Sequence, residues 1–176
     1  QGIVDPKLVD TLPKRYRRSV EHSAMIYKFM ENKGISNFAP ALTSLLGPLD
    51  DAARRVMKTL LLPEMPKTDH EQRNWFWVDD RSISNYDFQK LKNMVLNLKK
   101  TLVYNGGFSP IGLLSCCLDY AATGSDDLNG VLRAVKQTFG FDGSVDLYKQ
   151  LVDVNEFRNT FVAHQEQELK DAKVAI

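Results

Sequence analysis

The chain has 176 residues, of which 43% are hydrophobic and 26% are charged. These proportions are close to those of globular proteins and exclude a disordered, collagen-like or low-complexity chain. No apolar run approaches the roughly 20 residues that a membrane span needs, and the N-terminus lacks the features of a signal peptide. We therefore expect one folded domain over residues 1–176 that is soluble, cytoplasmic and not bound to a membrane. Because the chain starts with Gln1 and not Met, we also expect it to be part of a longer parent chain.

The net charge of +1 gives no overall attraction to nucleic acid or to anionic membranes, but the charges are unevenly distributed. Residues 1–60 carry 10 basic and 6 acidic side chains, whereas residues 101–176 carry 6 basic and 10 acidic ones. A phosphate-binding surface made by one chain should therefore lie in the first third of the sequence.

The first predicted helix begins around Pro13, where Asp10 or Thr11 can cap it, and runs to Gly34. Its apolar residues recur at intervals of three and four positions. Its first turns carry four basic residues, Lys14, Arg15, Arg17 and Arg18. This basic cluster is a candidate phosphate contact, and a solvated helix end beside acidic neighbours is the simpler interpretation.

Two further helices are predicted over residues 40–46 and 49–62, separated by Gly47-Pro48 and closed by Pro63. Residues 63–81 are predicted to form a loop. This loop contains four consecutive apolar residues, Trp75-Phe76-Trp77-Val78, which should pack on the bundle or on a partner. A platform for stacking nucleic-acid bases is the more specific interpretation of the same residues.

Four more helices complete the chain, over residues 82–104, 109–122, 126–139 and 144–170. Ser84 is a candidate cap, Pro110 occupies a first helical position, and glycines end three of these helices. The adjacent Cys116 and Cys117 lie in an apolar stretch and should be core residues, because neighbours in a helix cannot form an ordinary disulfide. No strand pattern or internal repeat is present. The fold class is therefore an all-α, up-and-down helical bundle of about five to seven helices.

The last predicted helix places a charged residue in the middle of an apolar face. With about 100° per residue, five apolar residues lie within roughly 60° of Arg158: Leu147, Leu151, Val154, Phe161 and Val162. Burying an unpaired guanidinium costs several kcal/mol, so Arg158 must form an ion pair, reach a wet cleft or lie at an interface. His164 lies about 120° around the helix, at the edge of the same apolar arc, and Asn159 flanks the arginine.

An arginine and a histidine at one boundary can cleave RNA without a metal ion. When the RNA 2′-hydroxyl attacks the adjacent phosphorus, protons must be transferred and the growing negative charge must be neutralised. Histidine titrates near neutrality, and the planar guanidinium matches phosphate oxygens. Arg158 and His164 are too far around one ideal helix to grip the same phosphate, and a two-fold dimer would pool two copies of each residue.

The segment from Arg158 to His164, with the sequence RNTFVAH, resembles the Arg-Asn-x4-6-His signature of HEPN domains. The resemblance implies a helical bundle in which dimerisation builds a metal-independent ribonuclease site. Arg158 would then stabilise phosphate charge, Asn159 would be its polar companion, and His164 would be the acid or base. The wider run over residues 154–166 is similar to the end of bacterial restriction-type and defence helicases, which implies attachment to such a helicase.

Two other interpretations of these residues remain open. Arg158 can be a structural residue paired with an aspartate of a neighbouring helix. The domain can also be a non-catalytic module for dimerisation, nucleotide binding or protein docking, as many HEPN domains are. No metal or cofactor is expected, because His22, His70 and His164 are scattered and neither paired Cys/His spacing nor a phosphate-binding glycine loop is present. The expected partners are a second copy of the chain, which would contact Phe157, Phe161 and His164, and RNA.

Overall fold

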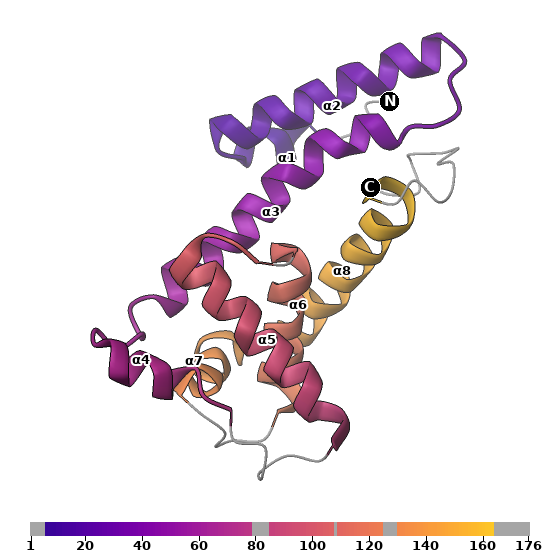
Figure 1. The fold of residues 1–176 in the computed structure, drawn as a ribbon. Coiled ribbons are helices and arrows are strands. Elements are labelled where there is room, and N and C mark those ends of the chain that lie inside the picture. The colour runs from indigo at the N-terminus through magenta and orange to yellow at the C-terminus, as the bar shows by residue number, and fades with distance from the viewer. Residues whose placement is uncertain (1–5, 79–84, 108, 125–129, 164–176) are drawn as a thin grey trace. The chain divides into compact units, whose positions relative to one another are not determined.

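The computed structural model describes residues 6–78, 85–107, 109–124 and 130–163. Within these ranges the chain forms eight α-helices and one π-helix, and no strand (Figure 1). The predicted all-α helical bundle is therefore confirmed. The chain divides into two compact units, which are considered separately below. Unit 1 comprises Gln1–Asp50 and Val154–Ile176, and unit 2 comprises Asp51–Asp153.

Unit 1 contains α1 (Pro6–Thr11), α2 (Lys14–Asn32) and the first part of α3 (Ala39–Leu61). Helix α2 ends where the sequence predicts, because Gly34 adopts a left-handed backbone conformation with φ of 66°. Five buried residues form the core of this unit: Tyr27, Met30, Phe38, Ala41 and Leu42. The rings of Tyr27 and Phe38 lie 4.7 Å apart, and Phe157 from the end of the chain packs against the same core.

Helix α3 corrects one sequence prediction. Residues 40–46 and 49–62 do not form two helices, because α3 continues through Gly47 and Pro48. A proline inside a helix removes one backbone hydrogen bond and costs about 3 kcal/mol. The helix nevertheless buries an apolar stripe on both sides of the proline, at Leu42, Leu46, Ala53, Met57 and Leu61. Burial of several apolar side chains outweighs the cost of one proline.

Helix α4 (Asp69–Trp75) corrects a second prediction, since residues 63–81 were expected to form a loop. The Thr68 side chain caps this helix by accepting a hydrogen bond from the backbone N–H of Glu71 at 3.4 Å. The Thr68 hydroxyl also donates to the Glu71 carboxylate at 2.6 Å. This is the Thr-x-x-Glu pattern of a helix start, a signal that was present in the sequence.

The apolar run that begins at the last residue of α4 is partly buried and partly exposed. Trp75 and Phe76 are each only 8% exposed, as the prediction of packing on the bundle requires, whereas Trp77 is 69% exposed. The Trp75 indole lies against Gly130, the first residue of α7 (Gly130–Phe139), where any Cβ would overlap it. Glycine at this position therefore allows α4 to pack closely on α7.

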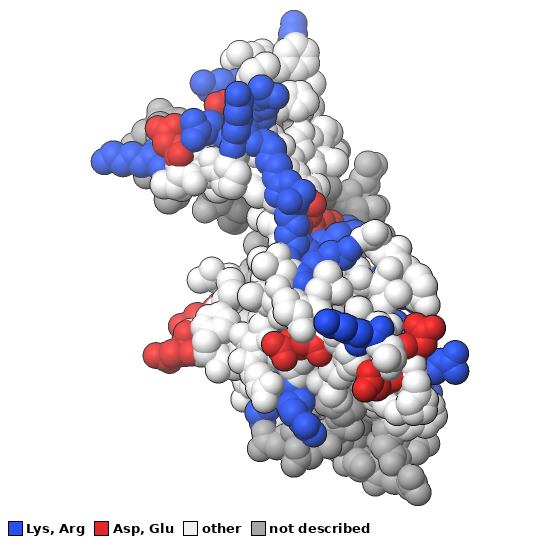
Figure 2. All heavy atoms as spheres, turned by 90° about the vertical axis from the view of Figure 1, so that its left-hand side faces the viewer, with Lys and Arg blue, Asp and Glu red and all other residues white. Residues whose placement is uncertain are grey.

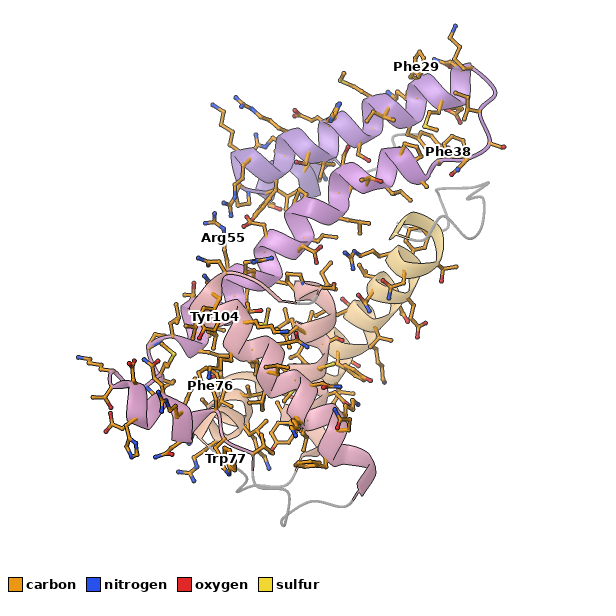
Figure 3. All side chains as sticks on the ribbon, viewed as in Figure 1. Phe29, Phe38, Arg55, Phe76, Trp77 and Tyr104 are labelled. Carbon is orange, nitrogen blue, oxygen red and sulfur yellow. The ribbon has the colours of Figure 1, made fainter. Side chains whose placement is uncertain are left out.

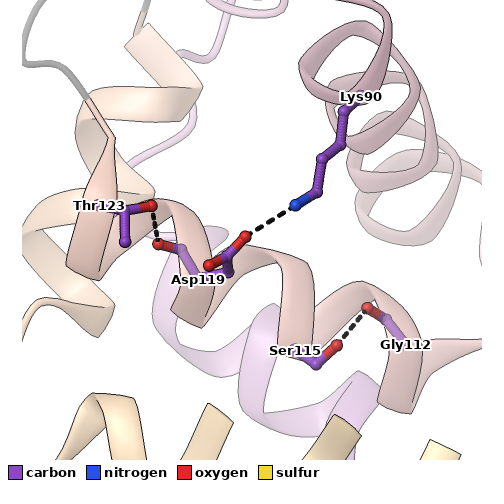
Figure 4. Close-up of polar contacts among 5 residues, drawn as sticks. All are labelled: Lys90, Gly112, Ser115, Asp119 and Thr123. Carbon is purple, nitrogen blue, oxygen red and sulfur yellow. Dashed lines mark hydrogen bonds and ion pairs between the residues drawn. The ribbon is translucent and has the colours of Figure 1, made fainter. Parts of the chain in front are cut away.

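Helices α5 (Asn85–Tyr104), α6 (Pro110–Thr123) and α7 form most of the core of unit 2. Helix α6 packs against both α5 and α7, and ten of its fourteen residues are buried. Lys90 of α5 forms a 2.8 Å ion pair with Asp119 of α6, and the Thr123 hydroxyl donates to the Asp119 carbonyl (Figure 4). The predicted cap Ser84 lies outside the described residues.

Both cysteines of α6 are free thiols, as the sequence predicts. Cys117 is completely buried and Cys116 is partly buried. Burial raises the pKa of both thiols, because a low-dielectric interior disfavours the charged thiolate. Among the helices that the structure describes, none is both long and apolar enough to cross a membrane.

Candidate functional site

The residues of the Arg-Asn-x4-His motif begin where the last α-helix ends. Helix α8 (Ser144–Phe157) does not continue as an α-helix to residue 170, because Arg158–Ala163 form a π-helix. In a π-helix each N–H bonds to a carbonyl five residues back, so the backbone turn is wider than in an α-helix. Such turns are rare and occur frequently at functional sites. Arg158 is the first residue of this turn.

Arg158 is paired with an aspartate of α3. A guanidinium nitrogen of Arg158 lies 3.6 Å from the carboxylate Oδ2 of Asp50, and the two side chains are 24% and 22% exposed. This pairing agrees with the expectation that an arginine on the apolar face needs a partner. It also corresponds to the structural interpretation of Arg158, in which an aspartate of a neighbouring helix neutralises it.

The ion pair with Asp50 does not use most of the N–H donors of the Arg158 guanidinium. At 3.6 Å the contact is longer than a hydrogen bond and is not the bidentate fork that arginine forms with a well-aligned carboxylate. Among the residues that the structure describes, no hydrogen bond from the Arg158 guanidinium is present. Arginine carries five N–H donors, so an anion that reaches this partly exposed group can still be bound.

The position of Arg158 is set by its neighbour in sequence. Phe157 packs against the core of unit 1 together with Ile26 and Leu45, which holds the end of α8 beside α3 (Figure 3 labels Phe38 of this core). Phe157 was expected to contribute to a dimer interface, and here it contacts the core of its own chain. Any interface at this edge must therefore use other residues as well.

Of the three predicted catalytic residues, the structure places two. Asn159 follows Arg158 in the π-helix and is partly buried. His164 lies outside the described residues, as do the side chains of Phe161 and Val162. Asp50 is the additional residue at this site that was not named from the sequence. No local pattern identifies it, because its pairing with Arg158 depends on how α3 and α8 meet.

The predicted phosphate-binding cluster lies on the first turns of α2. Lys14 and Arg18 are exposed, and Figure 2 shows Lys and Arg side chains gathered at the height of α1 and α2. The guanidinium of Arg15 lies 4.3 Å from the centre of the Tyr16 ring and donates to the Tyr16 hydroxyl. Cations at the start of a helix oppose the helix dipole, so a bound anion would relieve this repulsion.

Arg17 has a structural role within this cluster. Its guanidinium donates to the backbone carbonyl of Asp10 at 2.8 Å and lies 3.7 Å from the Asp10 carboxylate. These contacts join α1 to the start of α2. Within the described part of the chain, no contact joins Arg17 or the other three basic residues to Arg158. The structure therefore gives two separate basic features in unit 1.

No metal centre is found among the residues that the structure describes, where no three His, Cys, Asp or Glu side chains come together. Comparison of the chain with protein-family models, with curated proteins and with solved structures found no match.

Proposed function

We propose that this chain is a HEPN-type domain that cleaves RNA phosphodiesters without a metal ion and is attached to a restriction-type or defence helicase. The observation that carries the proposal is the position of Arg158, at the start of a π-helix and held by one long ion pair. The guanidinium is partly exposed, so RNA phosphate can reach it. The attachment to a helicase is supported by the resemblance of residues 154–166 alone.

The proposed reaction needs only proton transfer and charge neutralisation. A base removes the proton of the RNA 2′-hydroxyl, whose oxygen attacks the adjacent phosphorus. The bond from phosphorus to the 5′-oxygen breaks, and an acid protonates that oxygen. The products are a 2′,3′-cyclic phosphate and a 5′-hydroxyl. In this proposal His164 is the acid or base, Arg158 stabilises the charge on phosphorus oxygens, and Asn159 donates a hydrogen bond to one of them.

A homodimer is part of the proposal, because one copy of the motif does not supply both an acid and a base. Two chains related by a two-fold axis would place two copies of His164 and Arg158 around one phosphate. Light scattering of the 176-residue chain at high micromolar concentration tests this directly. A dimer is expected, and a strictly monomeric chain would remove the composite site.

The decisive experiment measures cleavage of single-stranded RNA by the intact chain in the presence of EDTA. We expect cleavage to persist, to give products that end in a cyclic phosphate, and to be fastest near the titration range of histidine. His164→Ala should slow the reaction by about 10²- to 10⁴-fold, the usual contribution of general acid–base catalysis. The exposed His70 of α4 provides the matched control, since His70→Ala should leave the rate unchanged.

A second candidate function is favoured by one specific observation, the ion pair between Arg158 and Asp50. In a non-catalytic module for dimerisation, nucleotide binding or protein docking, this pair would serve the fold only. Such a module would cleave no RNA between pH 5 and 9 even with protein in excess. Either that result, or equal rates for His164→Ala and the parent chain, would replace the nuclease proposal by this one.

A further inference from the structure

A pocket with a volume of about 490 Å³ lies in unit 2, between the C-terminal end of α4 and one face of α5. This volume is within the range of small-molecule sites. Figure 3 labels Phe76 and Trp77, which lie where the chain leaves α4. The pocket is distinct from the Arg158 motif, which belongs to unit 1. Nothing in the proposed nuclease reaction requires it.

The lining of the pocket combines aromatic rings with positive charge. Six of its residues carry this chemistry: the aromatic Phe76, Trp77 and Phe88, and the basic Arg73, Lys92 and Lys99. No acidic residue is among those that line it in the described part of the chain. Phe76 is 8% exposed, whereas Trp77 is 69% exposed.

Two of the three cations lie beside aromatic rings. The amine of Lys92 lies 5.5 Å from the centre of the Phe88 ring, and the amine of Lys99 lies 5.8 Å from that of Phe76. Within the described residues, neither lysine nor Arg73 forms an ion pair with a carboxylate. Three cations around an aromatic pocket, with no carboxylate among the described lining residues, favour a ligand that has both a flat ring and negative charge.

We infer that this pocket binds a nucleotide within a single strand of nucleic acid, with its base against the aromatic residues and its phosphates near the three cations. Lys92 and Lys99 are seven residues apart on α5, a rise of about 10 Å along the helix. This separation allows the two lysines to contact different phosphates of one strand. A single-stranded ligand follows because bases in a duplex are stacked on each other and cannot enter a pocket.

Trp77 provides a direct measurement, because it is exposed and the only other tryptophan, Trp75, is buried. A 12-nucleotide uridine RNA and the matching thymidine DNA should both bind the intact chain and quench its tryptophan emission. Trp77→Ala should weaken binding by about 5- to 150-fold, the range for loss of one stacked base. Trp77→Phe should keep most of the affinity and lose the quenching. Tyr104 is 68% exposed at the end of α5 and does not line the pocket, so Tyr104→Ala is the matched control.

The charge contribution is tested by the salt dependence of binding. Lys99→Ala should reduce the slope of log affinity against log salt by about 0.7, the value for one phosphate contact on a single strand. Lys100→Ala removes the same charge from the next residue of α5, which does not line the pocket, and should leave the slope unchanged. Circular dichroism of each variant confirms that the helices are intact.

Three results would overturn the inference. The first is equal affinities of Trp77→Ala and Tyr104→Ala for the single strands. The second is binding of a duplex or of polyglutamate that is as tight as, or tighter than, binding of the single strands. The third is competition by uridine monophosphate that is as effective as competition by the 12-nucleotide strand. The DNA strand separates this test from the nuclease proposal, because DNA lacks the 2′-hydroxyl that the cleavage needs. Binding without cleavage would support the pocket and remove the nuclease, and cleavage without Trp77-dependent binding would do the opposite.

Discussion

The two units differ in how deeply they bury their side chains. Among the residues that the structure describes, the ten largest fully buried side chains all lie in unit 2, whereas the core residues of unit 1 retain some exposure. Unit 1 nevertheless holds the charged Arg158 on an apolar helix face. The desolvation penalty of a guanidinium is smaller in a shallow, partly wet core than in a dry one. The comparison teaches that the less deeply buried unit tolerates a charged side chain on an apolar helix face at a lower cost.

The largest effect is expected from removing a buried leucine in unit 2. Leu118 is fully buried on α6, so Leu118→Ala should lower the free energy of unfolding by about 2–5 kcal/mol. The matching change in unit 1 is Leu42→Ala, which should cost less because its surroundings are closer to solvent. Urea denaturation followed by tryptophan emission and by circular dichroism measures both.

The two spectroscopic signals also test whether the two units unfold independently of each other. Both tryptophans lie in unit 2, whereas circular dichroism reports the helices of both units. In Leu42→Ala the change in circular dichroism should begin at lower urea than the change in tryptophan emission. Equal losses for the two variants, with coincident transitions, would mean that the contrast between the units has no energetic consequence.

An intermediate decrease in the free energy of unfolding is expected at alkaline pH, and a residue of unit 2 should cause it. Burial raises the pKa of the Cys117 thiol above its ordinary value of 9.0, so the folded chain keeps a proton that the unfolded chain loses. This contribution to stability is fully present below pH 9 and decreases above it, by up to about 1.4 kcal/mol per pH unit. Urea denaturation between pH 8.5 and 10 measures the decrease. Cys117→Ala should reduce the decrease and leave the part due to Cys116, whose pKa is also raised, and an unchanged slope would show that another group is responsible.

The smallest effect is expected from the ion pair of unit 1. The Arg158 and Asp50 side chains are partly exposed, so a double-mutant cycle with Arg158→Ala and Asp50→Ala should give a coupling of about 0.2–1 kcal/mol. Arg158→Ala should therefore cost less stability than Leu42→Ala. A loss of several kcal/mol would instead indicate a dry pair whose remaining partner is left buried and unpaired.

Sequence patterns predicted helix ends better than they predicted continuity. Gly34, Pro110 and Gly140 act locally on the backbone, and the corresponding helices end or begin within a few residues of the predicted bounds. The break at Pro48 was predicted wrongly because the burial that keeps α3 continuous is a property of the folded chain. The capping pattern at Thr68 is present in the sequence, but the prolines at 63 and 66 favour a loop over the same stretch.

The candidate site was predictable only in part for the same reason. Helical periodicity placed Arg158 on an apolar face and required a partner for it. It did not identify Asp50, which is distant in sequence, or the π-helix, because the apolar spacing was interpreted with the period of an α-helix. The pocket beside α5 was equally hidden, because its cations are spread over two helices and only its aromatic run is visible in the sequence.

Pro48 lies two residues before the boundary between the units, and this has a consequence for how α3 opens. Because proline has no N–H, the carbonyl of Ser44 receives no helical hydrogen bond. The series of backbone hydrogen bonds along α3 is therefore interrupted at this turn. Unfolding that starts at Ala39 therefore reaches the missing backbone hydrogen bond just before Asp51. It can stop there and leave the hydrogen bonds of the later turns of α3 intact. In amide exchange, the residues before Pro48 should lose protection as one group and those after Asp51 as another, so one continuous helix would belong to two cooperative units.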